Sequence, residues 1–278
     1  MRINPSDGSA IISILLKSVS EDFFKSKNVN SNSILKNKNL EVIAKSSVIK
    51  NNEFVVVLDP GHGGKDPGAE AGGYRESNLM LELALAVKES LIRNTDFKVI
   101  LTRNEDVFLS LDDRITIATQ SGADLFISLH ADAVIEGEAS GTTIYLLSEN
   151  ATDKMSAQLA ARHDRSKILR DVDLSGLDSQ IASVLIDIAR QETKPRNEAV
   201  ASFILQVFKE QITELSSQPL RYAAFSVLKS PDIPSILIEA GFMSTSSDLQ
   251  NLITPKWRIE FADALSEAIS RWQIKDKQ

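Results

Sequence analysis

The sequence VVVLDPGHGG, residues 55–64, decides how the chain is expected to fold. A buried strand of a parallel sheet is typically a continuous run of valine, isoleucine or leucine closed by turn residues. The run here ends in a Pro/Gly-rich turn that carries His62, one of three histidines in 278 residues. Ligands of open α/β sheets bind beyond the carboxyl ends of the strands. His62 is therefore a candidate binding residue, with a solvated loop histidine as the equal alternative for this residue taken alone.

Apolar runs and helical periodicity alternate along the rest of the chain. Strands are expected at 54–59, 98–102, 124–129, 142–147, 223–228 and 235–239. Helices are expected at 78–93, 109–121, 197–215 and 258–272. Strands that alternate with helices of this length predict an α/β fold, in which helices cover both faces of a mostly parallel sheet of about six strands.

Two segments differ from this pattern. Residues 1–52 hold a short apolar run, expected to form a β-strand rather than an export signal, and a Lys/Asn/Ser-rich stretch at 25–52 that is typical of a linker. A catalytic domain is expected at 53–274. Within it, residues 150–195 add about 45 residues without a clear strand, which in a compact domain indicates a functional or disordered insertion. Helical spacing predicts two helices there, near residues 155–160 and 181–188.

Composition limits the possible functions. The net charge of −7 argues against nucleic acid as a partner. No apolar run is long enough to form a transmembrane segment. Because the chain has no cysteine, any metal must be held by histidines and carboxylates, a donor set that suits Zn²⁺ in an open catalytic site.

Two further strands end in residues that can bind a metal or move a proton. His130 follows the strand at 124–129, and Glu239 ends the strand at 235–239. In a parallel sheet these ends share one edge with His62, and the helix that Glu76 precedes begins at the same edge. Two imidazoles and one carboxylate are a usual ligand set for a hydrolytic zinc. A second glutamate, free of the metal, can act as general base.

Each of these residues has a structural alternative. Glu76 could simply stabilise a helix N-terminus, which is the favoured interpretation of that residue alone. His130 could be a hydrogen-bonded core histidine. Glu239 is the strongest single candidate, because a carboxylate after a buried strand is costly unless it is paired or functional. The turn at 61–65 lacks the Gly-Lys-Ser/Thr ending of a phosphate loop, so we reject that function for it.

Four blocks of sequence, in order, carry a family resemblance. They are DPGHGG at 59–64, Glu76, SLHADA at 128–133 and EAGF at 239–242, with Arg103 and Arg114 also matching. Over about residues 54–272 the chain resembles the zinc-dependent N-acetylmuramoyl-L-alanine amidases. The resemblance implies a three-layer α/β sandwich, a Zn²⁺ ion held by His62, Glu76 and His130, and Glu239 as the catalytic residue. It implies hydrolysis of the amide between N-acetylmuramic acid and L-alanine in peptidoglycan.

The chain departs from this family in three places, one of which is Ala118-Thr119, where an alanine-asparagine pair is usual. The family often has asparagine where Asp132 stands, so an extra negative charge is expected near the metal, with altered hydrogen bonding around it. The insertion resembles the helical segment of cell-division amidases that covers the active site, supplies a glutamate to zinc and is displaced by a LytM-type partner. No glutamate stands at 159–164. We expect His163 or Asp164 to cap the zinc instead, with a surface position for His163 as the even alternative.

The resemblance also implies a setting for the protein. Peptidoglycan lies outside the cytoplasmic membrane, so a periplasmic location is expected, although no export signal is readable at the N-terminus. Residues 1–24 could be the end of a wall-targeting β domain, and a monomer is expected. Two other functions stay open: a non-catalytic wall-binding protein on the same fold, and a zinc peptidase that trims stem peptides.

Overall fold

The computed structural model describes residues 2–3, 10–11, 53–134, 139–164, 179–211 and 214–276, without the side chains of 179–192. The chain divides into two compact units, Met1–Asn52 and Glu53–Gln278. In the first unit, β1 (Arg2–Ile3) pairs antiparallel with β2 (Ala10–Ile11). The predicted linker at 25–52 and the stretch at 165–178 lie outside the described residues.

The second unit is built on a six-stranded sheet. Its strand order is β6 (Lys98–Leu101), β3 (Val55–Pro60), β7 (Leu125–His130), β10 (Ser235–Glu239), β8 (Thr142–Leu147) and β9 (Leu215–Ala223). The first four strands are parallel, β8 runs antiparallel to β10, and β9 is parallel to β8. The prediction of a mostly parallel sheet of about six strands is therefore confirmed.

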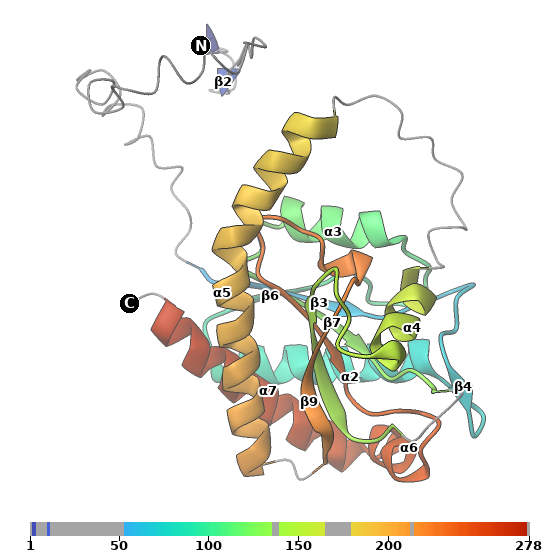
Figure 1. Cartoon of the computed structure of the whole chain (residues 1–278). Helices are drawn as coiled ribbons and strands as arrows, with labels where there is room; N and C mark the ends of the chain where they lie inside the picture. The colour runs from blue at the N-terminus through green and yellow to red at the C-terminus, as the bar shows by residue number, and fades with distance from the viewer. Residues whose placement is uncertain are drawn as a thin grey trace. The chain divides into compact units, whose positions relative to one another are not determined.

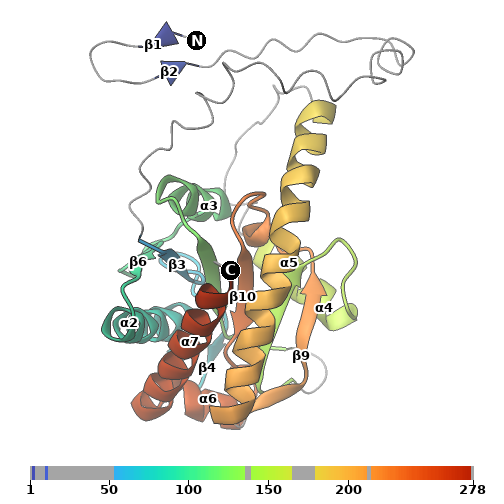
Figure 2. The ribbon, with the colours of Figure 1, turned by 90° about the vertical axis from the view of Figure 1, so that its left-hand side faces the viewer.

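Helices cover both faces of this sheet, which gives the three layers expected (Figures 1 and 2). One face packs against α2 (Glu76–Asn94), α5 (Ser179–Gln211), α6 (Ser246–Ile253) and α7 (Pro255–Asp276). The other packs against α3 (Leu111–Gln120), α4 (Lys154–His163) and the 3₁₀ turn η4 (Ser226–Leu228). Alternation along β3 explains the arrangement, since Val56 and Leu58 enter the first core and Val57 enters the second. A short hairpin of β4 (Glu70–Ala71) and β5 (Tyr74–Arg75) precedes α2.

The prediction of a strand at 223–228 is wrong. The strand in this region is β9, which ends at Ala223, and residues 226–228 form η4. In the described part of the chain, β9 is an edge strand that pairs with β8 alone, and its first half after Leu215, residues 216–219, is polar and partly exposed. An edge strand needs no continuous apolar run, so the sequence carried little signal for it.

The helices predicted near 181–188 and at 197–215 form one helix, α5, which continues through Pro195. Proline lacks an amide hydrogen and usually marks a boundary, but packing of α5 against α7 and the sheet outweighs this preference here. The C-terminal end of the segment 150–195 is therefore continuous with a core helix, because α5 runs across residue 195. No helix in the described part of the chain is long and apolar enough to cross a membrane.

Candidate active site

Three neighbouring strands end at the same edge of the sheet. His130 and Glu239 close β7 and β10 and are register partners in that parallel pair. On the other side of β7, Pro60, the last residue of β3, lies opposite Leu129. His62 comes two residues after Pro60 and therefore lies at the same edge of the sheet as His130. Gly61 packs against the His130 ring so closely that a Cβ there would lie 2.3 Å from His130 Cε1. A side chain at position 61 would therefore displace the imidazole.

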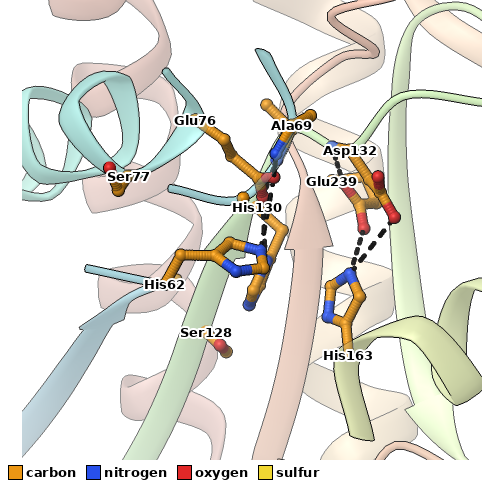
Figure 3. A network of polar contacts seen from close by, with 12 residues as sticks. His62, Ala69, Glu76, Ser77, Ser128, His130, Asp132, His163 and Glu239 are labelled. Atoms are coloured by element: carbon orange, nitrogen blue, oxygen red, sulfur yellow. Dashed lines mark hydrogen bonds and ion pairs between the residues drawn. The ribbon is translucent and has the colours of Figure 1, made fainter. Parts of the chain in front are cut away.

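Glu76 joins the two imidazoles. It is the first residue of α2 and is fully buried. Its Oε1 lies 3.1 Å from His130 Nδ1, and its Oε2 lies 3.3 Å from His62 Nε2 (Figure 3). The same carboxylate accepts the amide hydrogens of Ala69 and Ala131 at 2.9 and 3.0 Å. Glu76 thus does more than stabilise a helix N-terminus, because its carboxylate faces both histidines.

The electrostatics of the cluster follow from burial and these carboxylates. Burial lowers the pKa of His62, but Glu76 and Asp66 outweigh it and raise that pKa to about 10. Burial would raise the pKa of Glu76, but the two imidazoles hold it well below its usual value. Burial, together with the neighbouring His163, lowers the pKa of His130 to about 4. Glu76 is therefore a charged ligand candidate beside two imidazoles of different proton affinity.

His163 brings a third imidazole to the cluster from the last residue of α4. Its ring centroid lies 4.2 Å from that of His130 and 5.7 Å from that of His62. One nitrogen from each ring can be chosen so that all three lie within 4.8 Å of one another. Asp164 behaves differently, since its two oxygens accept the Ser226 amide and hydroxyl hydrogens at 3.1 and 2.7 Å. Of the two residues expected to cap a metal, His163 is the one that stands beside the other histidines.

These residues fit a zinc ion. His62 Nδ1 lies 2.9 Å from a carboxylate oxygen of Asp66, which can only accept, so Nδ1 donates and a neutral ring keeps its lone pair on Nε2. That Nε2 is buried, makes no hydrogen bond and faces Glu76. Imidazole nitrogens and a charged carboxylate are the donors that zinc takes in hydrolytic sites. Asp66 was not singled out from the sequence, although its position four residues after His62 in the same glycine-rich turn was the available signal.

Glu239 lies beside this cluster and is fully buried. Its Oε2 accepts the Asp132 amide hydrogen at 3.0 Å, whereas its Oε1 makes no hydrogen bond and lies 3.7 Å from His163 Nε2. Burial raises the pKa of Glu239 well above its usual value, and the charges of Asp132 and Glu76 add to the effect. One oxygen of this carboxyl group is fixed by a hydrogen bond, and the other faces the cluster without one. This is the arrangement expected of a group that transfers protons.

Asp132 links the end of β7 to α4. Its carboxylate lies 3.1 Å from Arg162 Nη2 and 3.5 Å from His163 Nε2. Arg162 also donates through Nη1 to the carbonyl oxygen of Ala133 at 2.5 Å. The acid that replaces the expected asparagine therefore has a cationic partner on α4.

Arg103 and Arg114 are both buried and hold the backbone of the His62 turn. Arg103 donates to the carbonyl oxygens of Pro60 and Gly61 at 3.0 and 2.7 Å. Arg114 donates to the carbonyl oxygens of Pro60 and His62 at 2.8 and 2.7 Å and pairs with Asp59 at 2.7 Å. His62 has a φ of 58°, in the left-handed region, so these bonds hold a turn that is strained for a non-glycine residue.

Comparisons with known proteins show what the chain as a whole is similar to. Residues 56–271 match the family described as N-acetylmuramoyl-L-alanine amidase. The chain is 36% identical over 217 residues to N-acetylmuramoyl-L-alanine amidase AmiA of Escherichia coli, covering 77% of this chain and 74% of that relative. It is 34% identical over 222 residues to AmiC of E. coli, covering 79% of this chain and 52% of that relative. The chain thus spans about half the length of AmiC.

Solved structures share the fold. The amidase AmiC2 of Nostoc punctiforme has a TM-score of 0.56 and 27% identity, covering 80% of this chain and 97% of that one. An amidase from Clostridium difficile has a TM-score of 0.59 at 23% identity, covering 80% and 98%, and supports the fold alone.

Proposed function

Because the chain belongs to the N-acetylmuramoyl-L-alanine amidase family, as its motifs predicted, we propose that it hydrolyses the amide between N-acetylmuramic acid and L-alanine in peptidoglycan with the help of zinc. The observation that carries this proposal is the register of His130 and Glu239 on adjacent parallel strands. It brings a proton-transfer carboxylate beside two imidazoles and the Glu76 carboxylate, which is the minimum set for metal-assisted hydrolysis.

His62, Glu76 and His130 would hold the zinc ion. When bound, zinc supplies a Lewis acid that polarises the scissile carbonyl and acidifies water. Asp66 fixes the tautomer of His62, and the amides of Ala69 and Ala131 fix the Glu76 carboxylate. These contacts hold the donors in place before an ion arrives, which lowers the cost of ordering the site.

Glu239 would move the proton. Its Oε2 is anchored by the Asp132 amide, so Oε1 is the oxygen available to take a proton from the attacking water. The protonated carboxyl would then donate to the nitrogen of the leaving L-alanine, since expulsion of an amine requires its protonation. Burial and the charges of Asp132 and Glu76 raise the pKa of Glu239, and a bound cation would oppose this and favour the ionised carboxylate that a general base needs.

We further propose that α4 blocks the site at rest. His163 lies where it could occupy a ligand position, and Arg162 and His163 both contact Asp132. Leu159 and Ala160 anchor the helix in the second core. A LytM-type partner that binds α4 would free the site during cell separation. A substrate outside the cytoplasmic membrane would place the protein in the periplasm, and we propose that it acts there as a monomer.

Dye release from labelled sacculi, combined with zinc analysis, tests the proposed reaction. Glu239→Gln should keep stoichiometric zinc and lose amidase activity, because the amide cannot accept the water proton. Wild-type products should be intact stem peptides freed from glycan. Shortened stem peptides would instead indicate a zinc peptidase. Zinc binding without any cleavage, in the wild type and also in Arg162→Ala, which loosens α4, would indicate a wall-binding protein.

A matched variant tests the ligand set. His62→Ala should lose zinc as well as activity, whereas Glu239→Gln loses activity alone. If both variants bind zinc as the wild type does, His62 is not a ligand and the proposed site is wrong.

A further inference from the structure

Asp248 is a buried carboxylate that the proposed chemistry does not use. It lies in the first turn of α6 and is 4% exposed. Its Oδ2 accepts two backbone amide hydrogens, from Phe242 at 2.9 Å and from Gly141 at 2.8 Å. Gly141 is 107 residues away in the sequence, so one oxygen joins two distant segments.

Those segments are the loops that follow the two central site strands. Residues 131–141 follow β7, which ends in His130, and residues 240–245 follow β10, which ends in Glu239. Four further hydrogen bonds join the described parts of these loops and the start of β8. They are Met243 N to Asp132 O (2.9 Å), Val134 N to Ser244 Oγ (3.1 Å), Thr142 Oγ1 to Ala240 O (3.0 Å) and Thr245 Oγ1 to Ala139 O (2.6 Å). Each of these four bonds joins one atom of one segment to one atom of the other. Among the described residues in these bonds, Asp248 alone accepts hydrogen bonds from both segments through one oxygen.

A short chain of contacts leads from Asp248 to Glu239. Asp248 fixes the Phe242 amide, and the next residue, Met243, donates to the Asp132 carbonyl. The amide of the same Asp132 donates to Glu239 Oε2. A shift of the 242–243 backbone would therefore move the only hydrogen-bond donor recorded for the Glu239 carboxylate in the described structure.

The packing leaves little room for such a shift. A Cβ at Gly241 would lie 3.0 Å from Asp248 Cβ, so the loop runs directly against the carboxylate side chain. Close packing of this kind transmits a displacement instead of absorbing it.

We propose that Asp248 is a positioning residue that holds the Glu239 carboxylate in its reactive orientation through Phe242, Met243 and Asp132. The proposal rests on the proposed amidase function of this site. Catalytic groups must be held within about 0.5 Å of their working geometry, and a misplacement of about 1 Å can cost a hundredfold in rate. The opposing interpretation is a purely structural acid that stabilises the start of α6, which predicts lost stability with an unchanged rate per folded molecule.

The experiment compares Asp248→Ala and Asp248→Asn with Asp124→Ala. Asp124 is the matched control, because its Oδ2 accepts the Val55 amide hydrogen at 2.9 Å at the opposite end of the sheet. A soluble muropeptide gives kcat and KM, and thermal unfolding and zinc content are measured on the same samples. Asp248→Ala should lower kcat about tenfold or more with KM and zinc content unchanged. Asp248→Asn should recover most of kcat, since its amide oxygen can accept both backbone hydrogens.

A second measurement needs no substrate. Amide hydrogen exchange at Asp132 should speed up in Asp248→Ala and stay at the wild-type rate in Asp124→Ala. Unchanged exchange, or a kcat in Asp248→Ala equal to that of the wild type, overturns the positioning role. If neither the wild type nor Arg162→Ala, which loosens α4, cleaves the amide and exchange still speeds up, the positioning role stands and the proposed function fails.

Discussion

Replacing Arg162 with alanine should raise the activity of the partner-free protein. Arg162 ties α4 to the active-site loop through the Asp132 carboxylate and the Ala133 carbonyl. If α4 blocks the site at rest, removing both contacts favours the open state. The open state itself is unaltered by the substitution, because Arg162 leaves the site together with α4.

The size of the effect follows from the burial of the pair. The Arg162 and Asp132 side chains are 23% and 10% exposed, so the ion pair is largely shielded from water. A hydrogen bond between charged groups in such a setting contributes about 2 kcal/mol. Since 1.4 kcal/mol corresponds to a factor of ten, the open fraction and the basal rate should rise roughly 30-fold. Leu159, which is fully buried, keeps most molecules closed.

The assay is dye release from sacculi without any partner, with hydrogen exchange measured across α4 on the same samples. Arg162→Lys should give a smaller rise, because an ammonium keeps the charge but lacks the fork that reaches both acceptors. Arg271→Ala is the control, since it removes an exposed pair with Glu267 on α7 and should leave the rate unchanged. Faster exchange across α4 with no gain in activity would refute the blocking role of α4.

Two further predictions concern stability. Asp59→Asn should lower the free energy of unfolding by about 3 kcal/mol at pH 7, because it breaks a buried pair with Arg114. Burial raises the pKa of Asp59, but Arg114, Thr102 and Ser128 outweigh burial and bring the folded-state pKa below the unfolded value near 4. The stabilisation by the Asp59 carboxylate is therefore present above the unfolded value and is lost as the pH falls through the folded-state pKa. Urea unfolding at several pH values should show the difference between wild type and variant shrinking in acid, and a constant difference would contradict this. Removal of zinc by a chelator should lower the midpoint of thermal unfolding. Zinc added at a hundred times its dissociation constant should raise the free energy of unfolding by about 2.7 kcal/mol. A midpoint that does not change with zinc would argue against a metal site.

Much of the site could be predicted from the sequence because its residues stand at strand ends. The apolar runs before His62, His130 and Glu239 mark buried strands, and parallel topology brings such ends to one edge. The family motifs then predicted the fold class and the family, both of which are confirmed. These signals are local in the sequence, so no tertiary information was needed to read them.

Other features depend on contacts between distant segments. The polar edge strand β9 forms because β8 offers it hydrogen bonds, and α5 continues through Pro195 because it packs on α7 and the sheet. The side chains of His163 and Asp164 are adjacent in the sequence, yet one turns to the histidines and the other to Ser226. Nothing in the local sequence distinguishes them.

The sequence by itself determined the strands that carry the candidate donors to one edge of the sheet, because hydrophobic runs and turn residues act over a few positions. Only the tertiary structure decided what surrounds those donors: Asp66 at His62, Arg162 at Asp132, and Asp248 between two loops. The reason is physical, since a buried carboxylate takes its partners from whichever donors the fold brings within about 3 Å, and the sequence spacing of those donors carries no record of that distance.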